Sequence, residues 1–186
     1  MKEIRLVEMR ALEDNGMVVE GYAAVFDSVT NLGWMNEVID RNAFDGADMS
    51  DIVMKYNHEN NVLPMARTRG GSLQFEIDDH GLKIRAKLPD TSVNRDIYTL
   101  IQEGVLSKMS FAFTVKSEEY DYDTDTRRIL AFDKIFDVSV VDVPAYESTE
   151  IYARSKEQYN KEKEAYRKLE LEKKKALAIL SLENRF

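Results

Sequence analysis

The chain has 186 residues and a formal net charge of −8, with 44% hydrophobic and 32% charged residues. We expect a soluble protein with room for one substantial core, because it has no apolar run long enough to cross a bilayer and no signal-peptide pattern. The absence of cysteine excludes disulfides, thiolate metal sites and a cysteine nucleophile. Two histidines leave little for a metal centre, and we expect no cofactor.

The charge is distributed unevenly along the chain. Residues 154–186 contain ten Lys/Arg and six Asp/Glu, a formal charge of about +4, which leaves about −12 on residues 1–153. Most of these charges are expected to be solvated, and the acidic total argues against general nucleic-acid binding. The change in composition predicts a folded domain over residues 1–153 and a separate charged helix over 154–186.

The first part of the chain predicts β-hairpins. Four strands are expected at residues 3–12, 17–26, 73–77 and 82–88. Asn15-Gly16 is a strong signal for a short hairpin between the first two strands. Asp78-Asp79-His80-Gly81 predicts the turn between the other two, with a positive φ at Gly81. His80 is then a loop-tip residue without an expected chemical role.

The middle of the chain predicts one further strand and a helix. A strand over residues 52–58 places Ile52, Met54, Tyr56 and His58 on one face. Apolar residues at i, i+4, i+7 and i+8 predict a helix over residues 93–103, which Gly104 ends.

Three more strands are expected before the charged tail. They lie at residues 110–117, 128–134 and 137–143, with an acidic turn at 121–127 and with Pro144 ending the last strand. Residues 156–180 then lack Gly and Pro, are rich in Lys, Glu, Leu and Ala, and predict one long amphipathic helix. Its apolar stripe is close to heptad spacing, which predicts packing against a partner or a second copy; loose docking on its own domain is the alternative.

Hydrolysis of an amide by serine requires a hydroxyl, an imidazole that accepts its proton, and a group that orients the imidazole. His58 ends a strand among polar neighbours and is the better of two candidate bases. Period-two alternation places Ser110 on a strand face of small side chains, opposite the aromatic face of Phe111. Each pattern alone is also common in residues with only structural roles.

Two carboxylates are candidates for the orienting acid. Asp137 and Asp142 lie five residues apart in an apolar strand, so only one of them faces any given partner. A carboxylate in so apolar a run is costly unless it is paired.

These motifs resemble those of the prohead maturation proteases of tailed phages, which share the fold of the herpesvirus assemblins. The resemblance covers about residues 1–153. It includes GYAAVF at 21–26, NAF at 42–44, Asn57-His58, the hairpin at 78–88, LIQEG at 100–104, MSFAF at 109–113 and FDVSVVDVPA at 136–145. It implies a mainly β, α+β fold: a small closed or partly open antiparallel β-barrel with a few flanking helices.

The resemblance also implies the site and the biology. Ser110 would be the nucleophile, His58 the base and Asp137 the acid, with backbone N–H groups of Ala145 or Tyr146 in the oxyanion hole. The enzyme would act inside the procapsid in the bacterial cytoplasm and would not be secreted. It would cut the major capsid protein and its scaffolding segment, and itself.

Three other interpretations of the function stay open at the level of sequence. A catalytically inactive capsid-assembly or scaffolding module on the same fold would have an unreactive Ser110. Another hydrolase such as an esterase is less favoured, because the Gly-x-Ser-x-Gly motif is absent. A β-barrel that binds peptides by edge pairing is the generic alternative.

Overall fold

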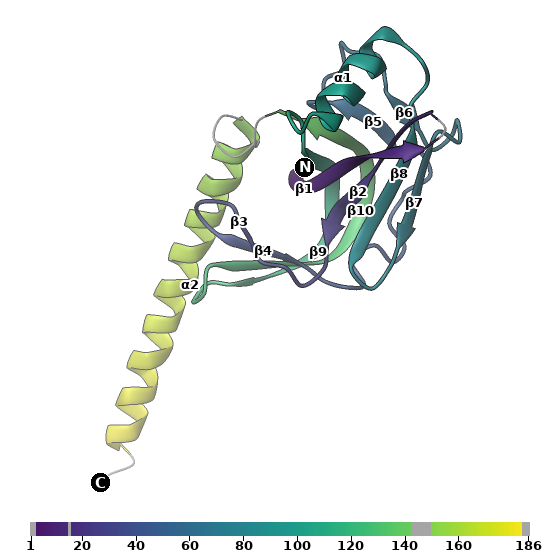
Figure 1. Ribbon diagram of the computed structural model, residues 1–186. Coiled ribbons are helices and arrows are strands. Elements are labelled where there is room, and N and C mark those ends of the chain that lie inside the picture. Colours follow the sequence, from purple (N-terminus) through teal and green to yellow (C-terminus); the bar gives the residue numbers. More distant parts are fainter. Residues whose placement is uncertain (1–2, 15, 143–149, 184–186) are drawn as a thin grey trace.

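The computed structural model describes residues 3–14, 16–142 and 150–183. The strands form a large twisted sheet, with one helix packed on it and a second helix extending away (Figure 1). The strands are β1 (Glu3–Asp14), β2 (Gly16–Val25), β3 (Thr30–Asn31), β4 (Asn36–Ile39), β5 (Val53–Tyr56), β6 (Ala66–Arg67), β7 (Leu73–Ile77), β8 (Gly81–Lys87), β9 (Lys108–Asp121) and β10 (Thr126–Val141). The helices are α1 (Ser92–Gln102) and α2 (Glu150–Glu183).

The strands follow the order β3-β4-β10-β9-β1-β2-β8-β7, and β5 and β6 continue the sheet from the other half of β10. Most neighbours are antiparallel, but β10 pairs in parallel with both β4 and β5. Among the described strands the ends of this path do not pair, so the sheet is not a closed barrel. The mainly β, α+β class is confirmed, closure is not observed, and likeness to the herpesvirus barrel stays a prediction.

The two predicted hairpins form with the expected strands. Gly16 has a φ of 124° between β1 and β2, a conformation that glycine adopts at no steric cost. The prediction of a positive φ at Gly81 is wrong. Glycine is needed there for another reason, because a Cβ atom would lie 2.0 Å from the carbonyl oxygen of Ala24 on β2.

Strand β10 is longer than the sequence indicates. Residues 128–134 and 137–143 were expected to form two strands, but a single strand of 16 residues runs from Thr126 to Val141. Its ladder with β9 shifts register at several points, including between Ile135 and Asp137. Bulges of this kind bend a strand without ending its pairing, so the sequence between the two runs is not a turn.

The core lies on one face of β9 and β10. Phe111, Phe113 and Phe132 are fully buried, with ring centroids between 4.7 and 5.8 Å apart. Their alternation with Ser110 and Ala112 is the period-two pattern of a strand. The aromatic residues therefore fix which face of β9 the serine occupies.

Helix α1 confirms the predicted helix to within one residue at each end. The hydroxyl of Thr91 accepts a hydrogen bond from the backbone N–H of Asn94 and caps its N-terminus. Ile97 and Ile101 are buried on the face that packs near β1 and β2. Gly104, with a φ of 71°, follows the helix end as expected.

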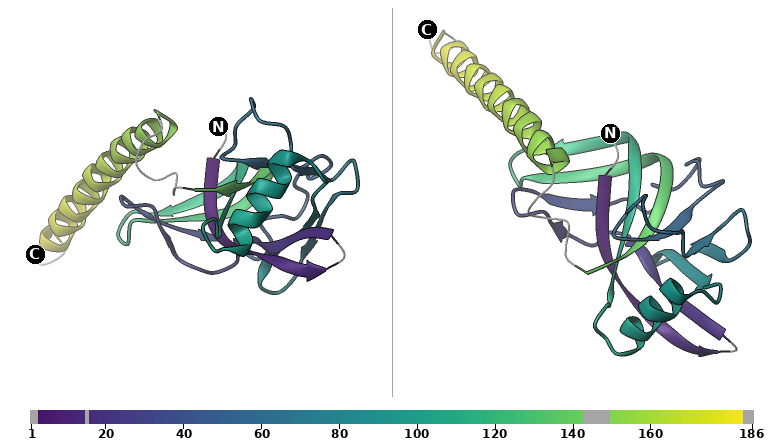
Figure 2. Two further views of the ribbon diagram at one scale, coloured as in Figure 1. Left: turned by 45° about the horizontal axis from the view of Figure 1, so that its top comes forward. Right: turned by 90° about the horizontal axis from the view of Figure 1, so that it is seen from above.

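Helix α2 is 34 residues long, and the contacts with the sheet among its described residues lie in its first half, between Tyr159 and Tyr166. Tyr159 is buried beside Leu32 and Met35, and Tyr166 packs on Tyr122. Beyond these contacts the helix extends away from the sheet (Figure 2). Leu169, Leu171 and Leu177 are half or more exposed there.

The long helix was predicted, whereas its use as a seam for a partner stays a prediction. So does the division into two domains. No helix among the described residues has the length and apolarity needed to span a membrane.

Candidate functional site

His58 lies just beyond the end of β5, in a left-handed turn. The strand ends at Tyr56, and the next two residues, Asn57 and His58, have φ values of 50° and 58°. Asparagine and histidine are both enriched among the non-glycine residues with this conformation, which nevertheless costs about 1–3 kcal/mol for a residue other than glycine. The prediction that His58 shares a strand face with Met54 and Tyr56 is therefore wrong, because the turn redirects its side chain.

The turn directs the imidazole at Asp137 on β10. Nδ1 of His58 lies 2.5 Å from Oδ1 of Asp137. The Asp137 side chain is 1% exposed and that of His58 12% exposed. A carboxylate so deeply buried is ionised only if it is paired, so it fixes the proton of the neutral imidazole on Nδ1 and leaves Nε2 as the basic nitrogen.

A lysine ammonium balances the charge of the buried carboxylate. Nζ of Lys55 on β5 lies 3.7 Å from Oδ2 of Asp137, and its side chain is only 17% exposed. The same ammonium donates a 2.7 Å hydrogen bond to the side chain of Asn60. Asp137 thus has a lysine on one oxygen and His58 on the other.

Ser110 on β9 lies on the same face of the sheet as this pair. It is directly opposite Ser139 of β10, and Ala112 is directly opposite Asp137. Opposite residues of an antiparallel pair have Cβ atoms about 4.5–5.5 Å apart, which places the Ser110 side chain next to Ser139. Within the described part of the chain, Ser110 Oγ and His58 Nε2 are both buried and have no hydrogen-bond partner.

Among the described residues, His58 and Asp137 are in direct contact, and Ser110 lies on the same face of the sheet without a hydrogen bond to His58. The family model of the caudovirus prohead serine proteases matches residues 5–164, which is most of the chain. The chain belongs to this family.

The prohead protease of Enterobacteria phage HK97 is one relative of this family member. The two are 28% identical over 140 residues, which cover 73% of this chain and 59% of the relative. The chain therefore spans less than two thirds of the length of that prohead protease. No solved structure gives a significant match. The resemblance seen in the motifs is confirmed at the level of the family.

Two residues that contact Asp137 were missed in the sequence of this prohead-protease family member. Ser139 Oγ lies 3.1 Å from Nδ1 of His58, 3.2 Å from Oδ1 of Asp137 and 3.2 Å from the backbone nitrogen of His58. Its position two residues after Asp137 places it on the same strand face, which is a signal that alternation alone provides. Lys55 was missed too, since no periodicity relates it to Asp137.

The other candidates lie away from this cluster. Asp142 is exposed and accepts a 3.0 Å hydrogen bond from the hydroxyl of Tyr56, as expected for the opposite strand face. His80 lies at the tip of the β7–β8 hairpin, where its ring contacts that of Tyr22. Ala145 and Tyr146, the expected oxyanion donors, lie outside the described residues.

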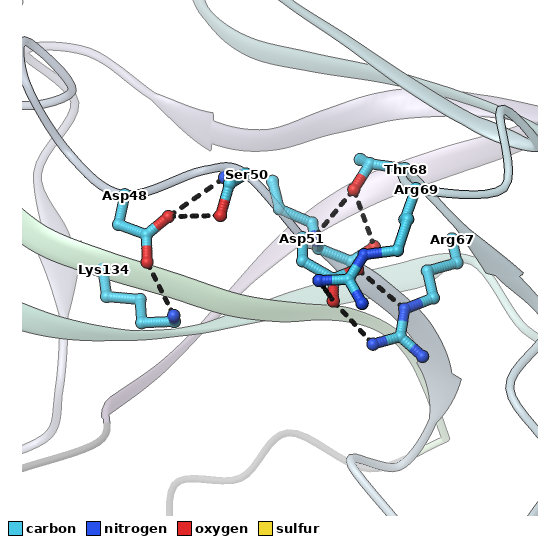
Figure 3. Close-up of polar contacts among 8 residues, drawn as sticks. Asp48, Ser50, Asp51, Arg67, Thr68, Arg69 and Lys134 are labelled. Atoms are coloured by element: carbon cyan, nitrogen blue, oxygen red, sulfur yellow. Dashed lines mark hydrogen bonds and ion pairs between the residues drawn. The ribbon is translucent and has the colours of Figure 1, made fainter.

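A separate group of ion pairs fixes the segment that enters β5 (Figure 3). Asp48 binds Lys134 of β10 at 2.6 Å, and this hydrogen bond holds the pKa of Asp48 well below its ordinary value. Asp51 pairs with Arg67 at 2.6 Å and Arg69 at 3.1 Å, and the hydrogen bond from Arg67 lowers the pKa of Asp51.

This group contributes to the site through position rather than through chemistry. Its members tie the segment before β5 to β10 and β6, and His58 follows β5 directly. No group of three or more His, Asp and Glu side chains in the described residues is arranged to hold a metal ion.

Proposed function

We propose that the protein is a serine endopeptidase with Ser110 as nucleophile, His58 as general base and Asp137 as the acid that orients the base. The observation that carries this proposal is the 2.5 Å contact between Nδ1 of His58 and the buried Asp137. The free Oγ of Ser110 and the free Nε2 of His58 on the same face supply the other half of the arrangement. Membership of the prohead serine proteases supports the same assignment.

The chemistry follows from these positions. Ser110 Oγ attacks the scissile carbonyl carbon while Nε2 of His58 accepts its proton. The imidazolium is stabilised by Asp137 and returns the proton to the leaving amine. Water then repeats the sequence on the acyl-enzyme, with His58 again as base. Backbone N–H groups, which we assign to Ala145 or Tyr146, stabilise the oxyanion.

Access to the nucleophile requires a change in this structure. Ser110 has no solvent-exposed surface, so a peptide reaches its hydroxyl only after covering groups move. In free enzymes, catalytic hydrogen bonds are often long or poorly aligned and tighten only when substrate binds. Association with a substrate shell or with a second copy would provide the driving force.

The substrates follow from the family. We infer that the enzyme cuts the major capsid protein and its scaffolding segment, and itself, within the procapsid in the host bacterial cytoplasm. The second half of α2 is an element for recruitment or for homodimer formation, since Leu169, Leu171 and Leu177 are exposed on it. Deleting residues 156–186 is expected to reduce incorporation into procapsids; unchanged incorporation would contradict this role.

The direct test is labelling with a fluorophosphonate probe, followed by peptide mapping, on the wild type, Ser110→Ala and His58→Ala. Each sample is also tested at high protein concentration with a kosmotropic salt, which strengthens association. Label at Ser110 that disappears in both variants would establish an activated serine. Cleavage of co-expressed capsid protein, abolished by Ser110→Ala, would then identify the substrate.

An inactive assembly module makes the opposite prediction. In that case the folded wild type takes no label under either condition. Procapsids assembled with Ser110→Ala would then mature as wild-type particles do. Both results together would overturn the proposed protease activity.

A further inference from the structure

The hydroxyl of Ser139 is fully engaged with the two residues that orient the proposed base. The backbone N–H of His58 donates to Ser139 Oγ at 3.2 Å. Oδ1 of Asp137 lies 3.2 Å and Nδ1 of His58 3.1 Å from the same oxygen. Ser139 is completely buried, so water does not compete for these bonds.

The direction of each hydrogen bond follows from the number of protons. Nδ1 of His58 carries the proton that it donates to Asp137 across 2.5 Å, so it does not accept one from Ser139. The single hydroxyl proton of Ser139 is therefore donated to Oδ1 of Asp137. Ser139 therefore accepts a hydrogen bond from the backbone N–H of His58 and donates one to the Asp137 carboxylate, which orients the imidazole of His58.

These bonds hold a left-handed backbone turn. His58 has a φ of 58°, in the left-handed region that non-glycine residues seldom occupy. Two bonds from β10 hold the turn: the N–H of Asn57 donates to the carbonyl of Val140 at 2.8 Å, and that of His58 to Ser139 Oγ. The hydroxyl oxygen of Ser139 thus fixes the position of the His58 backbone, from which the imidazole extends.

The same geometry separates the roles of the two serines. Ser139 lies at the Nδ1 edge of the imidazole, where the proton is already committed to Asp137, so no base is available to its hydroxyl. Ser110 lies directly opposite on β9, and its Oγ has no partner among the described residues. Of the two hydroxyls, only that of Ser110 is free to give its proton to Nε2.

We propose that Ser139 is a positioning residue, whose hydroxyl holds the left-handed Asn57–His58 turn and the Asp137 carboxylate in the geometry that the base requires. This inference rests on the proposed protease function. It assigns no contact with substrate to Ser139. The effect of losing the hydroxyl is on the orientation and tautomer of His58.

The test compares Ser139→Thr with Ser139→Val, which have the same shape and differ in the hydroxyl; Ser139→Ala is a smaller variant in case both disturb packing. The first readout is the rate of probe labelling at Ser110. The second is the ¹⁵N NMR signature of His58 in a His80→Gln background, which leaves one histidine to assign. Thermal melting shows whether each variant is folded.

We expect Ser139→Thr to label Ser110 within a few-fold of the wild-type rate, and Ser139→Val and Ser139→Ala to label it about 10–100-fold more slowly, as misplacement of a catalytic group does. The proton on Nδ1 of His58 should persist in Ser139→Thr. In the other two variants it should be lost or exchange between the two nitrogens.

Three outcomes would overturn the inference. Equal labelling rates in the Thr and Val variants would show that the hydroxyl is not used. Label found on Ser139 would make it a nucleophile. If the wild type takes no label at all, the proposed function fails instead, and the NMR signature decides the role of Ser139: an unchanged Nδ1–H in Ser139→Val contradicts it.

Discussion

Nδ1 of His58 lies 2.5 Å from Oδ1 of Asp137, although 79 residues separate them in the chain. The parallel pairing of β5 with β10 brings them together, with Val53 beside Asp137 and Tyr56 beside Val140. The imidazole therefore approaches the carboxylate from the end of a neighbouring strand.

Asp137→Asn is expected to leave the fold intact and to invert the tautomer of His58, because the amide can donate to Nδ1. Nε2 then carries the proton and cannot act as base, which in a serine protease lowers turnover by on the order of 10⁴. The checks are probe labelling of Ser110 and ¹⁵N NMR of His58.

The matched control for that change is Asp142→Asn, one residue beyond the end of β10. Its carboxylate is exposed and contacts Tyr56. The probe should label Ser110 of Asp142→Asn at nearly the wild-type rate. An equal loss of labelling rate in the two variants would show that Asp137 acts through its charge and not through its contact with His58.

Arg127→Ala is expected to destabilise the sheet by about 3–5 kcal/mol, because it leaves a buried carboxylate without its partner. Arg127 lies 3.1 Å from Glu37, and the side chains are 6% and 1% exposed. Arg127 also binds Glu118. Chemical denaturation measures the loss.

Arg41→Ala removes an ion pair with Asp27 in which both side chains are largely exposed. Surface ion pairs of this kind contribute little to the free energy of unfolding, so the denaturation midpoint of Arg41→Ala should be close to that of the wild type. A similar loss in both variants would mean that burial does not decide the contribution of Arg127.

Gly81→Ala tests whether strand β8 lies too close to β2 at Gly81 to leave room for a side chain. A Cβ atom there would lie 2.0 Å from the backbone carbonyl oxygen of Ala24, so strands β2 and β8 must separate. We expect a loss of at least about 1–3 kcal/mol. At Gly70 the nearest atom would be 3.7 Å away, so Gly70→Ala should be neutral or stabilise by about 0.4–1 kcal/mol. Equal effects on the melting temperature would contradict the close approach.

Local patterns predicted most strands, because each hairpin and the aromatic face of β9 are encoded by alternation and turn residues. The division of β10 was predicted wrongly, since a bulge near Phe136 and a turn leave similar signals in one sequence. Closure of the sheet was not predictable either. It depends on which strands pair with each half of β10, and long-range pairing leaves no local signal.

The same limit applies to the site. The resemblance to a family supplied His58, Ser110 and Asp137, but composition alone could not relate residues on β5, β9 and β10. The left-handed turn at His58 was missed because only its tertiary contacts hold it there. Ser139 could have been found by asking which side chains share a strand face with Asp137.

Helix α2 docks on the β9–β10 hairpin through Asp125, which lies in the turn of the hairpin. Asp125 accepts a 2.7 Å hydrogen bond from the hydroxyl of Tyr159 and pairs with Lys163. Both hydrogen bonds lower the pKa of Asp125, and the one from Lys163 has the larger effect. A carboxyl with a lowered pKa stabilises the folded contact above its ordinary pKa of about 3.9, and the contribution is lost as the pH falls through the lower value.

Docking of α2 should therefore weaken below about pH 4. Trp34, the only tryptophan of the chain, packs on Tyr159 with ring centroids 5.1 Å apart and reports this contact by fluorescence. The wild type should show an acid transition in Trp34 emission that Asp125→Asn largely removes, while Asp90→Asn, far from α2, retains it. Glu162 accepts a 3.5 Å hydrogen bond from the hydroxyl of Tyr122 on the same face, and Glu162→Gln should alter the transition less than Asp125→Asn does. An unchanged transition in Asp125→Asn would show that another group holds the helix.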